Sequence, residues 1–127
     1  EIKRIKYIGR QLGIAFQIQD DLFEIFKDEN NMGKSLGSDI FSNKKTAIAI
    51  EAKNINKTEW DSITRQFDGK DLENIRNFLL ENKVKYKVET LAEHYFNSAY
   101  SELSTLGFDK DSDTYKFFKM IQGRHSW

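Results

Sequence analysis

The sequence contains no cysteine and no proline in its 127 residues. Without cysteine, a disulfide framework and a cysteine-ligated zinc site are both impossible. A chain without thiols fits a cytoplasmic protein, which is the location that we predict. Because proline breaks helix interiors, its absence favours long helices.

The sequence also lacks an excess of charge of either sign, since 20 Lys and Arg residues balance 20 Asp and Glu residues. This balance argues against general nucleic-acid binding and against a polybasic membrane surface. The longest apolar runs are far shorter than the roughly 20 residues that span a bilayer, so we do not expect an integral membrane protein. The chain starts in helical periodicity without Met, an N-cap residue or a signal-peptide pattern. We therefore expect its first residue to be a cut inside a longer natural chain.

Helical periodicity is the main signal that the sequence does contain. One long helix is expected over residues 2–27, and Gln19 within its apolar face is expected to be a buried amide with partners. The predicted core-facing residues of this helix are Ile5, Ile8, Leu12, Phe16, Leu22, Phe23 and Phe26.

Five more helical segments follow a Gly-, Asn- and Asp-rich stretch at 28–42, which predicts an ordered loop. A short helix begins near Lys44, and the next is expected to start with Thr58 as its N-cap. The others are expected over 71–81, 84–106 and 112–121. No segment shows the alternation of apolar and polar residues that is typical of a β-strand. We therefore predict an all-α fold, a helical bundle, in a single domain over residues 1–127.

The apolar stripe expected for 84–106 consists of Val88, Leu91, Tyr95, Ala99, Leu103 and Leu106, with Gly107 as the C-cap. The packing residues expected for 112–121 are Tyr115, Phe117, Phe118 and Ile121.

Three carboxylates, Asp20, Asp21 and Glu24, lie in the middle of the first predicted helix, away from its core face. Asp competes with the helical backbone for hydrogen bonds, and like charges four residues apart cost about 0.2–0.5 kcal/mol. One interpretation is a cluster for Mg²⁺, which prefers oxygen ligands and is often shared with a substrate phosphate. The alternative is a solvated acidic face, and the spacing alone leaves both open.

Two lysines, Lys34 and Lys44, follow these carboxylates on either side of Gly37. Lysines near a Mg²⁺–carboxylate cluster suggest a bound polyanion such as a diphosphate. The alternative is that these lysines only keep the surface soluble.

The segment from Gly13 to Glu24 resembles the second aspartate-rich motif of trans-isoprenyl diphosphate synthases, Phe-Gln-x-x-Asp-Asp-x-x-Asp. In that family the motif is followed by Gly-Lys, then Gly-x-Asp, then a Lys-Lys-Thr-like segment. The same order appears here in Gly33-Lys34, Gly37-Ser38-Asp39 and Lys44-Lys45-Thr46. The resemblance is specific over residues 9–52; beyond them it consists of the helical pattern and a short aromatic–basic ending.

The resemblance implies the C-terminal portion of the all-α isoprenoid synthase fold, which surrounds a central cavity and usually forms a homodimer. Members of the family condense an allylic diphosphate with isopentenyl diphosphate in head-to-tail prenyl transfer. Mg²⁺ ions hold the allylic diphosphate between two aspartate-rich motifs. The first motif is expected in an absent N-terminal half, so we predict that this chain alone is inactive and that it self-associates or forms a homodimer.

Carried over by position, the family motif makes Asp20 the principal Mg²⁺ ligand, with Asp21 and Glu24 as supporting ligands. Glu24 departs from the usual Asp, and its longer side chain reaches farther. Gln17 would contact the diphosphate or its ordered water.

The positions after the motif supply the remaining expected roles. Lys34 and Lys44 would contact the allylic diphosphate and act with Asp20 in catalysis. Asp39 would orient the residues that bind metal and substrate without touching either itself. Two alternatives remain: a non-catalytic helical regulatory or interaction subunit derived from the same family, and a class I terpene cyclase. The Phe16-Gln17 and Asp20-Asp21 pairs argue against the cyclase.

Overall fold

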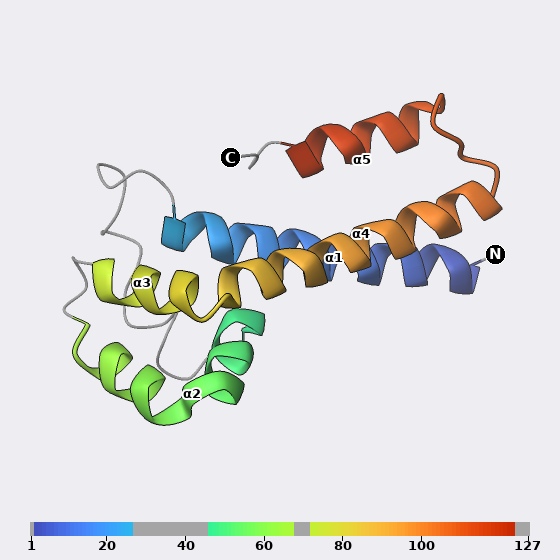
Figure 1. The fold of residues 1–127 in the computed structure, drawn as a ribbon. Coiled ribbons are helices and arrows are strands. Elements are labelled where there is room, and N and C mark those ends of the chain that lie inside the picture. The colour runs from blue at the N-terminus through green and yellow to red at the C-terminus, as the bar shows by residue number, and fades with distance from the viewer. Residues whose placement is uncertain (1, 27–45, 68–71, 124–127) are drawn as a thin grey trace. The chain divides into compact units, whose positions relative to one another are not determined.

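The computed structural model describes residues 2–26, 46–67 and 72–123, and within these ranges it contains five helices and no strand (Figure 1). The helices are α1 (Ile2–Phe26), α2 (Ala47–Arg65), α3 (Glu73–Glu81), α4 (Val84–Thr105) and α5 (Asp113–Gly123). The all-α prediction is confirmed.

The chain divides into two compact units, one formed by residues 1–19 and 90–127 and the other by residues 20–89. Helices α1 and α4 each contribute to both units. The assignment of all 127 residues to a single domain stays a prediction.

In the first unit, α1 and α4 lie antiparallel, because Tyr7 near the start of α1 contacts Ser98, whereas Phe16 farther along α1 contacts Phe96, which precedes Ser98 in α4. The Tyr7 hydroxyl and Ser98 Oγ are 2.6 Å apart, and the Phe16 and Phe96 rings meet edge to face with centroids 5.2 Å apart. Fully burying a side chain such as Phe96, which is 1% exposed, contributes about 1.5–3 kcal/mol. This pairing therefore builds the core of the unit.

The buried stripe of α1 differs from the predicted one. It is centred on Ala15, which is fully buried, and its members are Ile8, Leu12, Ala15, Ile18, Leu22 and Ile25. Ile5 is 60% exposed, and the three predicted Phe residues are only half-buried. The prediction favoured the largest apolar side chains. Which residues face the core is instead decided by their angular position around the helix, so that a small residue such as Ala15 can lie at the centre of the buried face.

The buried stripe of α4 includes Val88, Ala99 and Leu103, as predicted. Leu91, however, is 39% exposed, and the predicted stripe did not include the buried Phe96. The helix ends near Gly107, whose φ of +97° is a conformation that glycine adopts readily. The Phe108 amide then donates to the Leu103 carbonyl at 2.9 Å, which closes the helix as expected for a glycine C-cap.

Helix α5 contributes no buried side chain. Ser112 directly precedes the helix and caps it, since the Ser112 Oγ accepts from the Tyr115 amide at 3.2 Å. Phe117, predicted as a packing residue, is 53% exposed, and this prediction is wrong. The attachment of α5 within its unit is instead polar and aromatic: the Tyr100 hydroxyl donates to Gln122 Oε1 at 2.8 Å, and Lys119 Nζ lies 4.3 Å from the Tyr100 ring centroid.

The second unit contains α2 and α3. Thr46 caps α2 by accepting from the Ala49 amide at 3.1 Å, and Asn56 interrupts the helix with φ −157° and ψ 88°. Asn56 Oδ1 accepts from the Glu59 amide at 3.1 Å, so Asn56, rather than the predicted Thr58, caps the second half. The sequence correctly predicted that a helix starts in this region. The start lies two residues earlier than predicted, because the Asn56 side chain accepts the capping hydrogen bond in place of Thr58.

Helix α3 packs on α2 through Phe78 and Trp60, whose ring centroids are 5.5 Å apart. Both side chains are buried, together with Ile75 and Leu79 of α3. Only Asn82 and Lys83 separate α3 from α4, and Lys83 takes the left-handed conformation with φ 59°. This sharp connection redirects the chain into α4.

Candidate metal centre

The predicted metal ligands lie on the last two turns of α1. Asp20, Asp21 and Glu24 are half-buried, and Gln17 one turn earlier is exposed. Positions 17, 20, 21 and 24 follow the spacing that puts side chains on one helix face, away from the buried stripe. Each of the four side chains takes part in an interaction in the structure. The helix therefore presents an amide and three carboxylates on one side, as expected.

The C-terminal end of α1 is fixed by two cationic side chains from the same unit. Arg76 Nε of α3 donates to the Ile25 carbonyl at 2.6 Å, and Lys85 Nζ of α4 lies 5.3 Å from the Phe26 ring centroid. No basic residue occurs in the last turn of α1 itself. Cations near a helix C-terminus stabilise its dipole and satisfy its last carbonyls. Arg76 thus holds the backbone directly after Glu24.

Arg76 is a residue that sequence reasoning missed. It lies 51 positions after the carbonyl that it binds, so no local pattern links the two. The last turn of α1 has no basic residue, but this alone does not show that another element supplies one, because water can also satisfy the last carbonyls.

Gln19 lies directly before the carboxylates, on the other side of α1. Its Nε2 donates to the Gln122 carbonyl at 3.0 Å, while its buried Oε1 has no hydrogen-bond partner among the described residues. Gln19 was predicted to be a buried amide with partners; the residue is only half-buried, and it has a partner at nitrogen but not at oxygen.

Within the described residues, no group of three or more His, Asp or Glu side chains is gathered closely enough to hold a metal ion by itself. The donor types still suit Mg²⁺, which typically takes one or two carboxylates and completes its coordination with water and substrate phosphate oxygens. The donor atoms of Asp20, Asp21 and Glu24 are all carboxylate oxygens, the ligand type that Mg²⁺ prefers. Their assignment as ligands stays a prediction.

Lys34, Lys44 and Asp39, the other predicted site residues, lie outside the described residues. The structure therefore neither brings them to the carboxylates nor separates them. None of the helices in residues 2–26, 46–67 and 72–123 combines the length and the apolar character that a membrane span needs.

Comparison with known proteins identifies similar sequences around this site. The family profile described as polyprenyl synthetase matches residues 1–81. The chain is 32% identical to the farnesyl diphosphate synthase of Micrococcus luteus over 91 residues, which cover 70% of this chain and 31% of that protein. It is 30% identical to the geranylgeranyl diphosphate synthase of Saccharolobus solfataricus over 108 residues, 80% of this chain and 32% of that protein.

A third relative is the short chain isoprenyl diphosphate synthase of Methanothermobacter thermautotrophicus, which is 42% identical over 52 residues, 41% of this chain and 16% of that protein. The chain thus spans about a third or less of the length of these three curated relatives. No solved structure matches it.

Proposed function

Because the chain belongs to the polyprenyl synthetase family, we propose that it forms part of a Mg²⁺-dependent prenyltransferase of isoprenoid biosynthesis. The reaction is the head-to-tail condensation of an allylic diphosphate with isopentenyl diphosphate. One observation carries the proposal: Gln17, Asp20, Asp21 and Glu24 are spaced along one face of α1, within the residues that match the family.

In this proposal the carboxylates of Asp20, Asp21 and Glu24 bind Mg²⁺, which offsets the negative charge of the allylic diphosphate when bound. Asp20 is the principal ligand, and the other two assist it. The Gln17 amide donates a hydrogen bond to the diphosphate or to a water beside it.

The lysines act on the leaving group. Lys34 and Lys44 place ammonium groups against the diphosphate, where negative charge builds up as its bond to the allylic carbon breaks. Asp39 orients these groups without touching the substrate. The allylic cation that remains is attacked by the double bond of isopentenyl diphosphate, and the released diphosphate then accepts the proton whose loss completes the product.

Arg76 supports the site without touching the substrate. Its hydrogen bond to the Ile25 carbonyl holds the final turn of α1, one residue beyond Glu24. A helix end held in this way does not fray, so the spacing between Asp20 and Glu24 is retained.

The proposal includes a cytoplasmic location and a homodimer. Cell fractionation tests the first, and sedimentation of the chain over a range of concentrations tests the second.

The central experiment measures binding of a non-hydrolysable allylic diphosphate analogue by calorimetry, with and without Mg²⁺. We expect binding that requires Mg²⁺ and weakens by at least roughly tenfold in Asp20→Asn, because one charged ligand is lost. Asp111→Asn is the matched control, since Asp111 is an exposed carboxylate between α4 and α5, and it should bind like the unmodified chain.

Binding that is indifferent to both Mg²⁺ and Asp20 would contradict the site assignment. It would favour the alternative of a regulatory or interaction subunit, in which the acidic face is only solvated. Binding of the analogue that needs Mg²⁺ but survives Asp20→Asn would keep the proposed chemistry and reject Asp20 as its principal ligand.

A further inference from the structure

Helix α5 is held against α4 along a single helix face. Tyr115, Lys119 and Gln122 are spaced by four and three residues, which places them on one side of α5. All three contact the same residue of α4, Tyr100, which is 5% exposed. The Tyr100 ring centroid lies 4.9 Å from that of Tyr115 and 4.3 Å from Lys119 Nζ, and the Tyr100 hydroxyl donates to Gln122 Oε1 at 2.8 Å. Tyr100 is therefore the centre of the surface on which α5 docks.

The contacts on this face are of kinds that cost little to break. Among the described residues, two hydrogen bonds join α5 to another helix, and both end on Gln122: the bond from Tyr100 and the bond from Gln19 Nε2 to the Gln122 carbonyl at 3.0 Å. Such bonds contribute little net free energy, because water replaces the lost partner. Helix α5 also buries no apolar side chain, so the hydrophobic contribution that fixes α3 is missing. We therefore expect α5 to detach at a lower free energy than the rest of its unit.

The hydrogen bonds of the connection between α4 and α5 divide at one peptide bond (Figure 1). On the α4 side, the Phe108 amide donates back to the Leu103 carbonyl at 2.9 Å. On the α5 side, the Ser112 amide and hydroxyl both donate to the Asp109 carbonyl, at 3.0 and 2.8 Å. Within the described part of the chain, no hydrogen bond joins residues 106–108 to residues 109–112. The chain thus has a boundary between Phe108 and Asp109, where rotation breaks no hydrogen bond.

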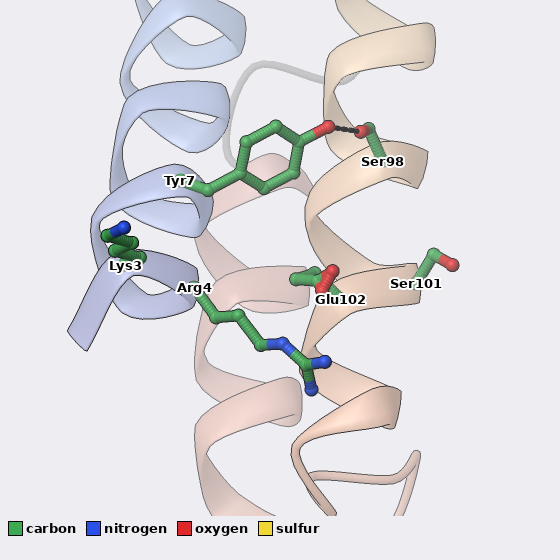
Figure 2. A pocket seen from close by; sticks show the side chains of 6 residues that line it. All are labelled: Lys3, Arg4, Tyr7, Ser98, Ser101 and Glu102. Carbon is green, nitrogen blue, oxygen red and sulfur yellow. Dashed lines mark hydrogen bonds between the residues drawn. The ribbon is translucent and has the colours of Figure 1, made fainter. Parts of the chain in front are cut away.

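The pair formed by α1 and α4 has contacts of its own that do not involve α5. Tyr7 and Ser98 line a pocket between these two helices, and their side-chain oxygens are 2.6 Å apart (Figure 2). Farther along, the Phe16 ring meets the Phe96 ring, and Phe96 is 1% exposed. The pair therefore keeps its hydrogen bond and its aromatic packing when α5 leaves.

We propose that residues 109–123 form a strap, which detaches from α1 and α4 and closes again as one unit around a hinge between Phe108 and Asp109. When closed, the strap covers the Tyr100 ring and binds the Gln19 amide. When open, it uncovers both. It then also loses its helix, because isolated helices shorter than roughly 12–15 residues are marginal in water and α5 has 11. Opening changes the surface of the unit without unfolding its core, and it does not depend on the proposed prenyl transfer.

The test is native-state hydrogen exchange of the ¹⁵N-labelled 127-residue chain, followed by NMR at several low urea concentrations. We expect the amides of residues 117–122 to share one opening free energy with a weak dependence on urea, because the opening of the strap exposes little surface. The amides of Phe96 and Ala99 in α4 should exchange only through global unfolding, with a strong dependence on urea.

One variant tests the attachment and the hinge together. Gln122→Ala removes the acceptor of the Tyr100 hydroxyl, so exchange in α5 should become roughly two- to tenfold faster. The Ser112 amide, on the strap side of the hinge, should accelerate as well, whereas the Phe108 amide should not. Met120→Ala is the matched control, since Met120 lies on the same helix and is 66% exposed, and it should leave these rates unchanged.

Three results would overturn the proposal. If α5 has the same protection and urea dependence as Phe96 and Ala99, it opens only with the whole unit. If protection instead decreases gradually toward Gln122 without a shared free energy, the helix frays from its end and no strap opens. If Phe108 accelerates together with Ser112 in Gln122→Ala, the hinge is wrong. The first two results come from the unmodified chain, so the proposal remains testable if the variant does not fold.

Discussion

Helices α3 and α5 are the two short helices of the structure, and both carry apolar side chains along one face, yet they are attached in opposite ways. Helix α3 buries three apolar side chains, including Phe78 against Trp60, whereas α5 buries none. Helix α5 is attached by the Tyr100–Gln122 and Gln19–Gln122 hydrogen bonds and by Lys119 above the Tyr100 ring. Apolar content alone therefore does not decide burial; the available partner surface does.

The largest expected effect comes from a matched pair of substitutions, Phe78→Ala and Phe117→Ala. Phe78 is 4% exposed, so its truncation leaves a cavity and should lower the free energy of unfolding by about 3–5 kcal/mol. Phe117 is 53% exposed, and its truncation should stay within about 0.5 kcal/mol. Urea unfolding followed by circular dichroism measures both. Equal costs would break the comparison, since they would mean that α5 is packed as tightly as α3.

The next largest effect is expected for Arg76→Met, which keeps an apolar stem and removes the guanidinium. Loss of the charged hydrogen bond to the Ile25 carbonyl should cost about 1.5–3 kcal/mol. Amide exchange in the last turn of α1 should also accelerate, as seen by NMR. Arg65→Met on exposed surface of α2 is the control. Unchanged exchange at Phe23–Phe26 would show that Arg76 does not hold this helix end.

A smaller effect is expected for Tyr100→Phe, which removes only the hydroxyl that donates to Gln122. The cost should be about 0.5–1.5 kcal/mol, and hydrogen exchange in α5 should rise while exchange in α3 stays the same. Tyr95→Phe, on the half-exposed side of α4, is the matched control. Equal acceleration in α3 would contradict the separate attachment of the two helices.

The last effect should be absent at neutral pH and should appear only at alkaline pH. Burial, with a smaller contribution from nearby Tyr115, raises the pKa of Tyr100 from 10.0 to about 12. Because the folded pKa lies above the unfolded one, the stabilisation is fully present below pH 10 and is lost as the pH rises from 10 to 12. Unfolding free energies should therefore fall more steeply over this window in the unmodified chain than in Tyr100→Phe. The same slope in both chains would show that Tyr100 does not titrate there.

The sequence predicted helix type and approximate bounds well because periodicity and end signals are local properties. Gly107 was identified as a cap because its need for a positive φ can be read from residue type. Asn56 was missed as a cap because Thr58 carries an equally suitable side chain, and only the path of the backbone selects between them.

Burial was predicted less well because it depends on neighbours far away in sequence. Ile5 and Phe117 are residue types that are common in protein cores, but no described residue covers them. Ala15 is fully buried, although its small side chain gives only a weak signal in the sequence. The candidate metal ligands could be predicted from the sequence because a family motif specifies residue types at fixed spacing on one helix. The role of Arg76 could not be predicted in this way, since Arg76 binds a carbonyl that lies 51 positions earlier in the sequence.

The most direct test of the central claim replaces Mg²⁺ by Mn²⁺, which favours the same oxygen ligands and broadens nearby NMR signals. In the presence of the allylic diphosphate analogue, Mn²⁺ should broaden the amide signals of residues 17–24 first, and Asp20→Asn should abolish that preference. Broadening that begins instead at the exposed acidic residues Asp109, Asp111 and Asp113, or that is the same in Asp20→Asn, would contradict a metal centre on α1.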